Sequence, residues 1–363
     1  MKLKSITIEN FRNIENETLL FSPETNLIFG DNAQGKTNVI EAIYAFSHAR
    51  SFRRAKEKEL IKFEKDRAVL SAVFEEKQRD VTFEIIFSKK GSKEFYYNGM
   101  RLEKMRDFFG HFLSVLFVPE YLKIIKNGPS ERRSFIDSAL CQIKPLFVSS
   151  LFSYHRLCEE KNALIKNFHG TEEEKLLLEV YNEKLVKSAS KISAERFSYL
   201  SRLEESAKSH FEKMSGGDEI SFKYLLSGEI QVDKTADFEE IYKNLFEKSL
   251  ENDIRLSRMS CGAQLDDVEI LINKKSARSF ASQGQMRSAV VALKLSEGEV
   301  IESTMKTSPV YLFDDILSEL DEKRREYILN SLHGKQVIIT SCMKEENFSQ
   351  TAFYAEKGTY KKI

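Results

Sequence analysis

Three short motifs that together make one kind of nucleotide site are spread over opposite ends of this 363-residue chain. The segment GDNAQGKT, Gly30 to Thr37, fits the phosphate-loop pattern without a mismatch. The other two, ASQGQ from Ala281 to Gln285 and PVYLFDDILSELD from Pro309 to Asp321, follow after roughly 240 residues. Because no local fold can join these pieces, the chain must return to its own N-terminal sheet, and the residues between become an insertion.

The phosphate loop has the context that such loops need. An apolar strand is expected over Thr25–Phe29, and helical spacing begins at Asn38. The glycines let backbone N–H groups face phosphates at the positive end of that helix. Lys36 is placed to reach the β- and γ-phosphates of ATP, and the Thr37 hydroxyl to ligate Mg²⁺. A chance match in a glycine-containing turn is the alternative. The predicted nucleotide-binding residues of the loop are Gly30, Asp31, Asn32, Ala33, Gln34, Gly35, Lys36, Thr37 and Asn38.

The late motifs supply carboxylates and a second anion site. An apolar strand, Val310–Phe313, ends in Asp314 and Asp315. We expect Asp314 to hold Mg²⁺, and Asp315 to orient or deprotonate the attacking water. Asp315 and Lys36 are the predicted catalytic residues. A strand-end turn capped by aspartate is the alternative. The segment ASQGQ, Ala281 to Gln285, which we call the signature motif, stands at the start of a helix and forms the second anion site. Since one chain already has a phosphate loop, this second site calls for a partner. Its predicted nucleotide-binding residues are Ser282, Gln283, Gly284 and Gln285.

The remaining pattern predicts an α/β protein with an inserted helical lobe. Strand-like alternation recurs from Ala68 to Arg101, with turns at Lys90-Gly91-Ser92 and Asn98-Gly99, and indicates an antiparallel sheet. Amphipathic helices follow as a hairpin broken near His169-Gly170, too short for a long coiled coil. Further strands are expected at 220–226 and 267–272, with a helix at 238–254. We assign 1–125 and 260–363 to one domain, and 126–259 to the helical lobe.

Six ordered stretches resemble the RecF family, within the ABC-type ATPase heads of the SMC and Rad50 class. They are IENFRNI, GDNAQGKTNVIEAIY, ARSFR, FVPEYLKIIKNGPSERRSFID, FASQGQMRSAVVALKL and LFDDILSELD. They run in family order from end to end. The resemblance implies an ABC-type P-loop ATPase head with an antiparallel β subdomain, plus a mainly helical second lobe.

The resemblance also implies roles. Arg12 would approach the nucleotide phosphates, and Ser282 would cap the γ-phosphate on a second head in an ATP-dependent homodimer. The DNA ligands would be double-stranded DNA and junctions between single- and double-stranded DNA. The protein would cooperate with RecR and RecO in loading RecA, during gap repair, replication and the SOS response. Asp315 stands where related heads often have glutamate, although aspartate is usual in this family, and we therefore expect slow hydrolysis. The resemblance also implies that DNA stimulates this hydrolysis. Where many family members read G-P-H-R-D-D, this chain has Gly262 to Asp267, and the family's His and Arg cannot be carried over.

A basic segment is the predicted DNA contact. The formal net charge is zero, so nucleic-acid binding requires a local patch. The first such patch lies between Arg50 and Lys56, and a looser second set consists of Lys123, Lys126, Arg132 and Arg133. Each set has a plainer interpretation as a solvated face paired with Glu57, Glu59 or Glu131. The predicted DNA-binding residues are Arg50, Arg53, Arg54 and Lys56.

Other classes compete less well. A Rad50- or SMC-type tether needs a far longer coiled coil, and a transporter's ATPase subunit has its motifs closer together. A nucleotide-regulated scaffold that binds only proteins is a third alternative. With no apolar targeting or spanning run, we expect a cytoplasmic protein without a membrane partner. The four cysteines are widely spaced, which favours free thiols over disulfides.

Overall fold

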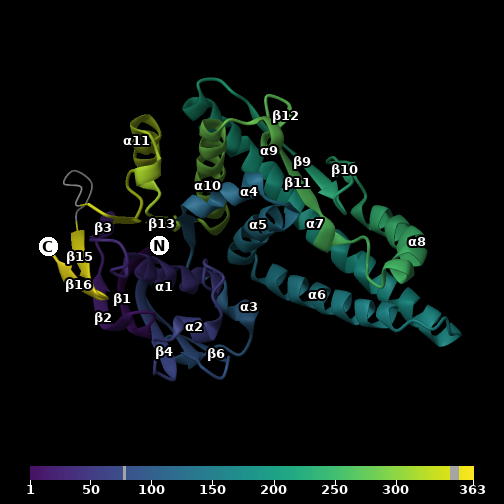
Figure 1. Ribbon diagram of the computed structural model, residues 1–363, viewed down its shortest axis with the longest axis horizontal. Helices are drawn as coiled ribbons and strands as arrows, with labels where there is room; N and C mark the ends of the chain where they lie inside the picture. Colours follow the sequence, from purple (N-terminus) through teal and green to yellow (C-terminus); the bar gives the residue numbers. More distant parts are fainter. Residues whose placement is uncertain (77–78, 344–350) are drawn as a thin grey trace. The chain divides into compact units, whose positions relative to one another are not determined.

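The computed structural model describes residues 1–76, 79–343 and 351–363, and these form two compact units. The first unit consists of Met1–Leu122 and Arg287–Ile363, and the second of Lys123–Met286. Both ends of the chain therefore contribute to one unit, as Figure 1 shows by its purple and yellow elements. The second unit includes residues 260–286, which the sequence had assigned to the domain built from the two ends.

A six-stranded sheet carries the phosphate loop. Its order is β16-β15-β3-β14-β13-β8, and all neighbours are parallel except β15 and β16. Strands β13 and β14 are mostly apolar and buried along almost their whole length, the pattern of a sheet covered on both faces. Pairing sets Leu27, near the start of the chain, opposite Ile339, near its end. The bounds are β3 Thr25–Phe29, β8 Ser114–Phe117, β13 Val310–Asp314, β14 Val337–Ser341, β15 Thr351–Glu356 and β16 Thr359–Lys362.

The predicted antiparallel sheet is confirmed, and the first two strands of the chain join it. Its order is β2-β1-β4-β5-β6-β7. One face packs around phenylalanines, with the Phe83 ring 4.9 Å from Phe108 and 5.6 Å from Phe46 of helix α1, Lys36–His48. These rings account for much of the apolar burial. The bounds are β1 Lys2–Phe11, β2 Ile14–Leu20, β4 Arg67–Glu76, β5 Arg79–Ser88, β6 Lys93–Tyr97 and β7 Met100–Arg101.

The helices of the first unit are mostly short, and α1 follows β3 as predicted. Helix α10 begins in the second unit and continues into the first, where nearly every residue from Ser288 to Ile301 is buried. Gly298 is required there because a Cβ atom would overlap the Tyr311 hydroxyl of β13. The bounds are α1 Lys36–His48, α2 Glu57–Leu60, α3 Met105–Phe108, η1 Pro119–Leu122, α10 Gln283–Met305, η3 Leu317–Glu319 and α11 Glu322–Ser331.

The second unit combines helices with a small antiparallel sheet. Helices α6 and α7 run in opposite directions, which confirms the predicted hairpin (Figure 1). Helix α7 begins with a capping box between Thr171 and Glu174 and ends after 44 residues at Gly216, with φ 78°. The sheet order is β10-β9-β11-β12. The bounds are α4 Lys123–Lys126, α5 Pro129–Ile143, α6 Pro145–Lys166, α7 Glu172–Ser215, β9 Ile220–Leu226, β10 Ile230–Val232, α8 Phe238–Leu256, η2 Ala263–Leu265, β11 Asp267–Ile272, β12 Lys275–Ser276 and α9 Ala277–Phe280.

Strand pairing explains why the second unit extends past residue 260. Strand β11 pairs along its whole length with β9, with Asp267 opposite Leu225 and Ile272 opposite Ile220. This pairing holds the segment after α8 in the second unit, and only the following helix α10 leads back to the first. The strand itself lies where the sequence predicted it, but its pairing partner could not be read from the pattern.

A buried carboxylate, Asp266, organises the segment that departs from the family pattern. It is fully buried, and it accepts hydrogen bonds from the hydroxyls of Tyr224 and Tyr242 at 2.7 Å each, and of Ser193 at 2.5 Å. The backbone N–H of Ser227 donates to it at 2.9 Å, and its carboxylate lies 3.4 Å from the Arg196 guanidinium. A buried charge is tolerated when it is paired and hydrogen-bonded in this way. The segment therefore has a structural role inside the second unit.

The cysteines and the hydropathy of the helices complete the description of the fold. The four cysteines all lie within the described residues and form no disulfide, as predicted. Among the helices of the described residues, none combines the length and the apolar character that crossing a bilayer requires.

Candidate nucleotide site

The phosphate loop connects β3 to α1 in a strained conformation. Gly30, Ala33 and Gly35 have φ values of 150°, 65° and 106°. A Cβ atom at Gly30 would overlap the backbone oxygen of Ala355, so only glycine fits there. Left-handed backbone is costly for a residue such as Ala33 and persists where surrounding structure fixes it. The loop is thus held in one arrangement by its neighbours.

Lys36 is buried at the end of this loop. Its side chain is 4% exposed, and Nζ donates to the carbonyl oxygens of Gly30, at 2.7 Å, and of Asp31, at 2.9 Å. Both of these partners are neutral carbonyls of the loop itself. An ammonium group enclosed by the loop in this way is positioned to neutralise an anion that the loop takes up.

The late carboxylates meet the phosphate loop at the carboxyl ends of the inner strands β3, β14 and β13. The Thr37 hydroxyl donates to Oδ1 of Asp314 at 2.8 Å, across 277 residues of sequence. Thr340, at the end of β14, donates to the same oxygen at 2.9 Å. Burial raises the pKa of Asp314, and the charge of Asp315 adds to this, whereas the two hydroxyls and the charge of Arg53 act in the opposite direction.

Asp315 is displayed by an unusual backbone conformation. Its φ is 50°, and its N–H donates to the Thr340 hydroxyl at 3.0 Å. Ser318 donates to its carbonyl oxygen at 2.8 Å, which shapes the turn after β13. Thr340 therefore braces both carboxylate residues. The sequence pattern contains nothing that identifies Thr340 as a bracing hydroxyl.

Arg12 is engaged by a partner that the sequence did not single out. Its guanidinium makes a bidentate ion pair with Glu41 of α1, at 2.8 and 2.7 Å, and donates to the carbonyl oxygen of Glu59 at 3.0 Å. Glu41 is fully buried and also accepts from the Ser51 hydroxyl. Nearby, Asn38 donates to the side chain of Asn13 at 2.7 Å. The turn between β1 and β2 is thereby tied to the start of α1.

The signature motif caps helix α10. The Ser282 hydroxyl accepts from the N–H of Gln285 at 3.2 Å, and the Gln285 side chain accepts from the Ser282 N–H at 2.9 Å. Gln285 also donates to Asp218 at 2.8 Å. Ser282 and Gln283 are exposed, and the whole motif belongs to the second unit, whereas the phosphate loop belongs to the first.

The basic segment is an exposed loop between α1 and α2. Arg50 lies beside the Tyr44 hydroxyl, whose pKa is raised by burial to about 12. Arg53 lies near enough to Asp314 for its positive charge to act on that carboxylate. In the second basic set Lys123 and Lys126 are exposed, whereas Arg132 is buried and makes a bidentate ion pair with Asp267, at 2.7 and 2.9 Å. The exposed residues of the first set are Arg50, Arg53, Arg54 and Lys56.

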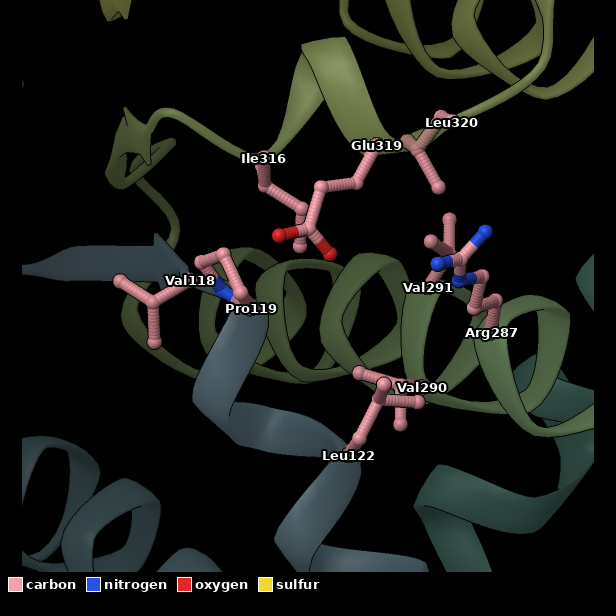
Figure 2. Close-up of a pocket in the computed structure, with 9 residues that line it drawn as sticks. All are labelled: Val118, Pro119, Leu122, Arg287, Val290, Val291, Ile316, Glu319 and Leu320. Carbon is pink, nitrogen blue, oxygen red and sulfur yellow. The ribbon is translucent and has the colours of Figure 1, made fainter. Parts of the chain in front are cut away.

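A small hollow lies beside the turn that follows β13 (Figure 2). Its lining is largely apolar, with Val118, Val290 and Ile316 among its residues, and it includes the charged side chains of Arg287 and Glu319. Figure 2 shows the Glu319 carboxylate turned toward helix α10. The lining contains no residue of the phosphate loop, so this hollow is separate from the loop.

The fold and the arrangement of these motifs define an ABC-type ATPase head of the class shared with SMC proteins. The family model described as RecF/RecN/SMC N terminal domain matches residues 2–359. A solved SMC head domain from Pyrococcus furiosus, 16% identical, superposes with a TM-score of 0.56 and supports the fold alone.

Within that class the chain belongs to the RecF family. It is 38% identical over 341 residues to the DNA replication and repair protein RecF of Clostridium acetobutylicum, covering 94% of this chain and 92% of the relative. The RecF of Agathobacter rectalis is 35% identical over 357 residues, with 98% and 96% covered. A solved structure of the recombination mediator protein RecF-ATP in the RecFOR pathway is 35% identical, with a TM-score of 0.93 and 100% and 97% coverage.

Proposed function

We propose that the chain binds ATP with Mg²⁺ at the phosphate loop and acts as an ATP-dependent DNA-binding protein in recombinational repair. The observation that carries this proposal is the 2.8 Å hydrogen bond between Thr37 and Asp314. It joins a hydroxyl and a carboxylate from opposite ends of the chain, the oxygen ligands that Mg²⁺ prefers. The relative described as RecF-ATP supports the choice of nucleotide.

Each residue then has a distinct task. Thr37 and Asp314 would hold Mg²⁺, which when bound supplies positive charge to the phosphates. Lys36 would leave its carbonyl partners for the β- and γ-phosphates, and the loop N–H groups would bind phosphate oxygens. Asp315 would orient the attacking water, and Arg12, held by Glu41, would lie beside the nucleotide. Since Asp315 is one methylene shorter than glutamate, we propose slow hydrolysis that serves as a switch.

A second copy of the chain would complete the site. Ser282 to Gln285 form a cap at the N-terminus of a 23-residue helix, with Ser282 and Gln283 exposed, and the helix dipole favours an anion there. We propose that this cap meets the γ-phosphate bound to a partner's phosphate loop. ATP would then favour the dimer by as much as it prefers the dimeric state. In this scheme the first unit is the ATPase head, and the second unit brings the signature motif.

DNA would bind through phosphate contacts of the basic loop. Arg50, Arg53, Arg54 and Lys56 are exposed and follow directly after helix α1. With about four contacts per head, log K should fall with log salt at a slope near −3.6, or about twice that for a dimer. We propose double-stranded DNA and single-/double-strand junctions as ligands, DNA-stimulated hydrolysis, and cooperation with RecR and RecO in loading RecA. An affinity independent of salt would contradict this interface.

The decisive experiment compares self-association and DNA binding in ATP and in ADP. Sedimentation velocity gives the dimer fraction, and fluorescence anisotropy gives DNA affinity. Lys36→Met should abolish both nucleotide effects, whereas Ser282→Arg should retain ATP binding and lose dimerisation. Ser209→Arg, on an exposed serine of α7, is the matched control and should behave like the wild type. Normal dimerisation of Ser282→Arg would refute the capping role.

A further inference from the structure

The last two strands of the chain lie against the phosphate loop. Strand β15 pairs with β3, which leads into the loop, and β16 pairs with β15 (Figure 1). The hairpin turn consists of Lys357 and Gly358, with φ values of 49° and 82°. Two left-handed residues in a two-residue connection make a type I′ turn, which matches the natural twist of a hairpin. The hairpin is therefore a well-defined element at the edge of the sheet.

Three hydrogen bonds join this hairpin to two consecutive residues of the loop. The N–H of Lys357 donates to the Gln34 side chain at 2.6 Å, and the N–H of Gly358 donates to the Gln34 carbonyl at 2.9 Å. The Tyr360 hydroxyl donates to the carbonyl of Gly35 at 2.9 Å. Burial raises the pKa of Tyr360, so its hydroxyl stays protonated and remains a donor at neutral pH.

Close packing adds to these hydrogen bonds. The backbone of Ala355 fills the space where a side chain at Gly30 would lie, and a Cβ at Gly35 would come within 2.8 Å of the Tyr360 hydroxyl. A Cβ at Gly358 would come within 2.7 Å of the carbonyl oxygen of Asn13. The hairpin turn is therefore enclosed between the loop and the turn that follows β1. Neither side can shift without the other.

The loop needs such support because its conformation is intrinsically unfavourable. Positive φ values at Gly30, Ala33 and Gly35 leave its backbone outside the regions that most chains adopt. A site whose groups are already held in the binding geometry loses less conformational freedom when its ligand arrives. We therefore expect the contacts of the hairpin with the loop to increase the affinity of the site for nucleotide.

We infer that the C-terminal β-hairpin, residues 351–362, is a positioning element of the phosphate site, with Tyr360 as its main positioning residue. This inference rests on the proposed nucleotide function. Tyr360 touches neither phosphate nor metal in this scheme. It acts through Gly35, one residue before Lys36, and so fixes the carbonyl and N–H directions at the start of helix α1. The extreme C-terminus thus controls a site formed near the N-terminus.

The test measures Mg²⁺·ATP binding by isothermal titration calorimetry together with the melting temperature of the nucleotide-free protein. Loss of one neutral hydrogen bond in Tyr360→Phe should raise the Kd about three- to tenfold. The melting temperature should change by no more than about 2 °C, because the ring and its packing remain. In steady-state hydrolysis KM should rise and kcat should stay unchanged, which a general loss of structure would not produce.

Two companion variants sharpen the result. Gly358→Ala, which forces a side chain against Asn13 in a left-handed turn, should weaken binding at least as much as Tyr360→Phe. Tyr354→Phe is the matched control, since among the described residues its hydroxyl makes no hydrogen bond to the phosphate loop, and its Kd should equal that of the wild type. Equal losses in Tyr360→Phe and Tyr354→Phe would overturn the inference, because the cause would then be hairpin packing.

Lys36→Met distinguishes a failure of the hairpin's positioning role from a failure of the proposed nucleotide site. If it abolishes binding while Tyr360→Phe and Gly358→Ala bind like the wild type, the hairpin has no positioning role and the proposed function stands. If Lys36→Met binds ATP as tightly as the wild type, the proposed nucleotide site itself is wrong. Weaker binding in both hairpin variants, with the control unchanged, supports the inference.

Discussion

Replacing Asp266 with asparagine should destabilise the second unit strongly, although the two side chains have almost the same shape. The carboxylate is fully buried and accepts from Ser193, Tyr224, Tyr242 and the N–H of Ser227, with the Arg196 guanidinium 3.4 Å away. An amide offers one oxygen and one NH₂ group. Hydroxyls can rotate to accept from that NH₂ group, but a backbone N–H or a guanidinium cannot.

The expected loss follows from the groups left without an acceptor. At least one donor that cannot adapt, and one hydroxyl, lose a hydrogen bond to a charged group, each worth about 1.5–3 kcal/mol. The buried guanidinium of Arg196 then retains its bidentate ion pair with Asp137, at 2.7 and 2.8 Å, but loses the second carboxylate. We therefore expect unfolding to become easier by about 3–5 kcal/mol, the range for breaking a buried charge pair.

The measurement is urea unfolding followed by near-ultraviolet circular dichroism, which reports on tyrosines because the chain has no tryptophan. Glu229→Gln removes the same charge from an exposed side chain of the same unit, and its stability should stay within about 0.5 kcal/mol of the wild type. A loss below about 1 kcal/mol in Asp266→Asn would refute the reasoning. It would mean that the donors around this carboxylate satisfy themselves elsewhere.

Three further outcomes are expected. Thr340→Val removes the hydroxyl that braces both carboxylates at the end of β13, and should lower kcat for ATP hydrolysis about 10- to 100-fold while the Kd for ATP changes less than about threefold, measured by phosphate release and calorimetry. Gly298→Ala should destabilise the first unit by about 1–3 kcal/mol in thermal melts, and adding Tyr311→Phe should recover part of this loss, because the clash is with that hydroxyl. Burial raises the pKa of the Cys158 and Cys261 thiols to about 11, so iodoacetamide should label these thiols slowly at pH 8 and faster as the pH approaches 11. Because the folded state favours the protonated thiols, the free energy of unfolding should also fall from about pH 9 upward.

The local motifs of the nucleotide site could be read from the sequence because each one is set by neighbours along the chain. Gly30 to Thr37 is a loop between an apolar strand and a helix, and its strand ends at Phe29 as predicted. The apolar run that ends in Asp314 and Asp315 behaves likewise. Short-range periodicity and turn chemistry are sufficient for such elements, since their hydrogen bonds are largely local.

The partners of those motifs were decided by tertiary structure. Nothing in the pattern indicated that Glu41 pairs with Arg12, that Thr340 braces both carboxylates, or that Arg132 pairs with Asp267 and not with Glu131. These contacts join residues that sequence spacing leaves independent. They form because a buried charge or N–H must find a partner wherever the packed chain offers one.

The sequence alone determined that the two ends of this chain must meet, because a phosphate loop without its carboxylate strand is half a site. Only the folded structure decided how they meet. Parallel pairing sets β14 between β3 and β13, so that Thr37 reaches Asp314. The same sheet places the C-terminal hairpin against Gln34 and Gly35. Strand order and register depend on burial summed over the whole sheet, which no local stretch of sequence contains.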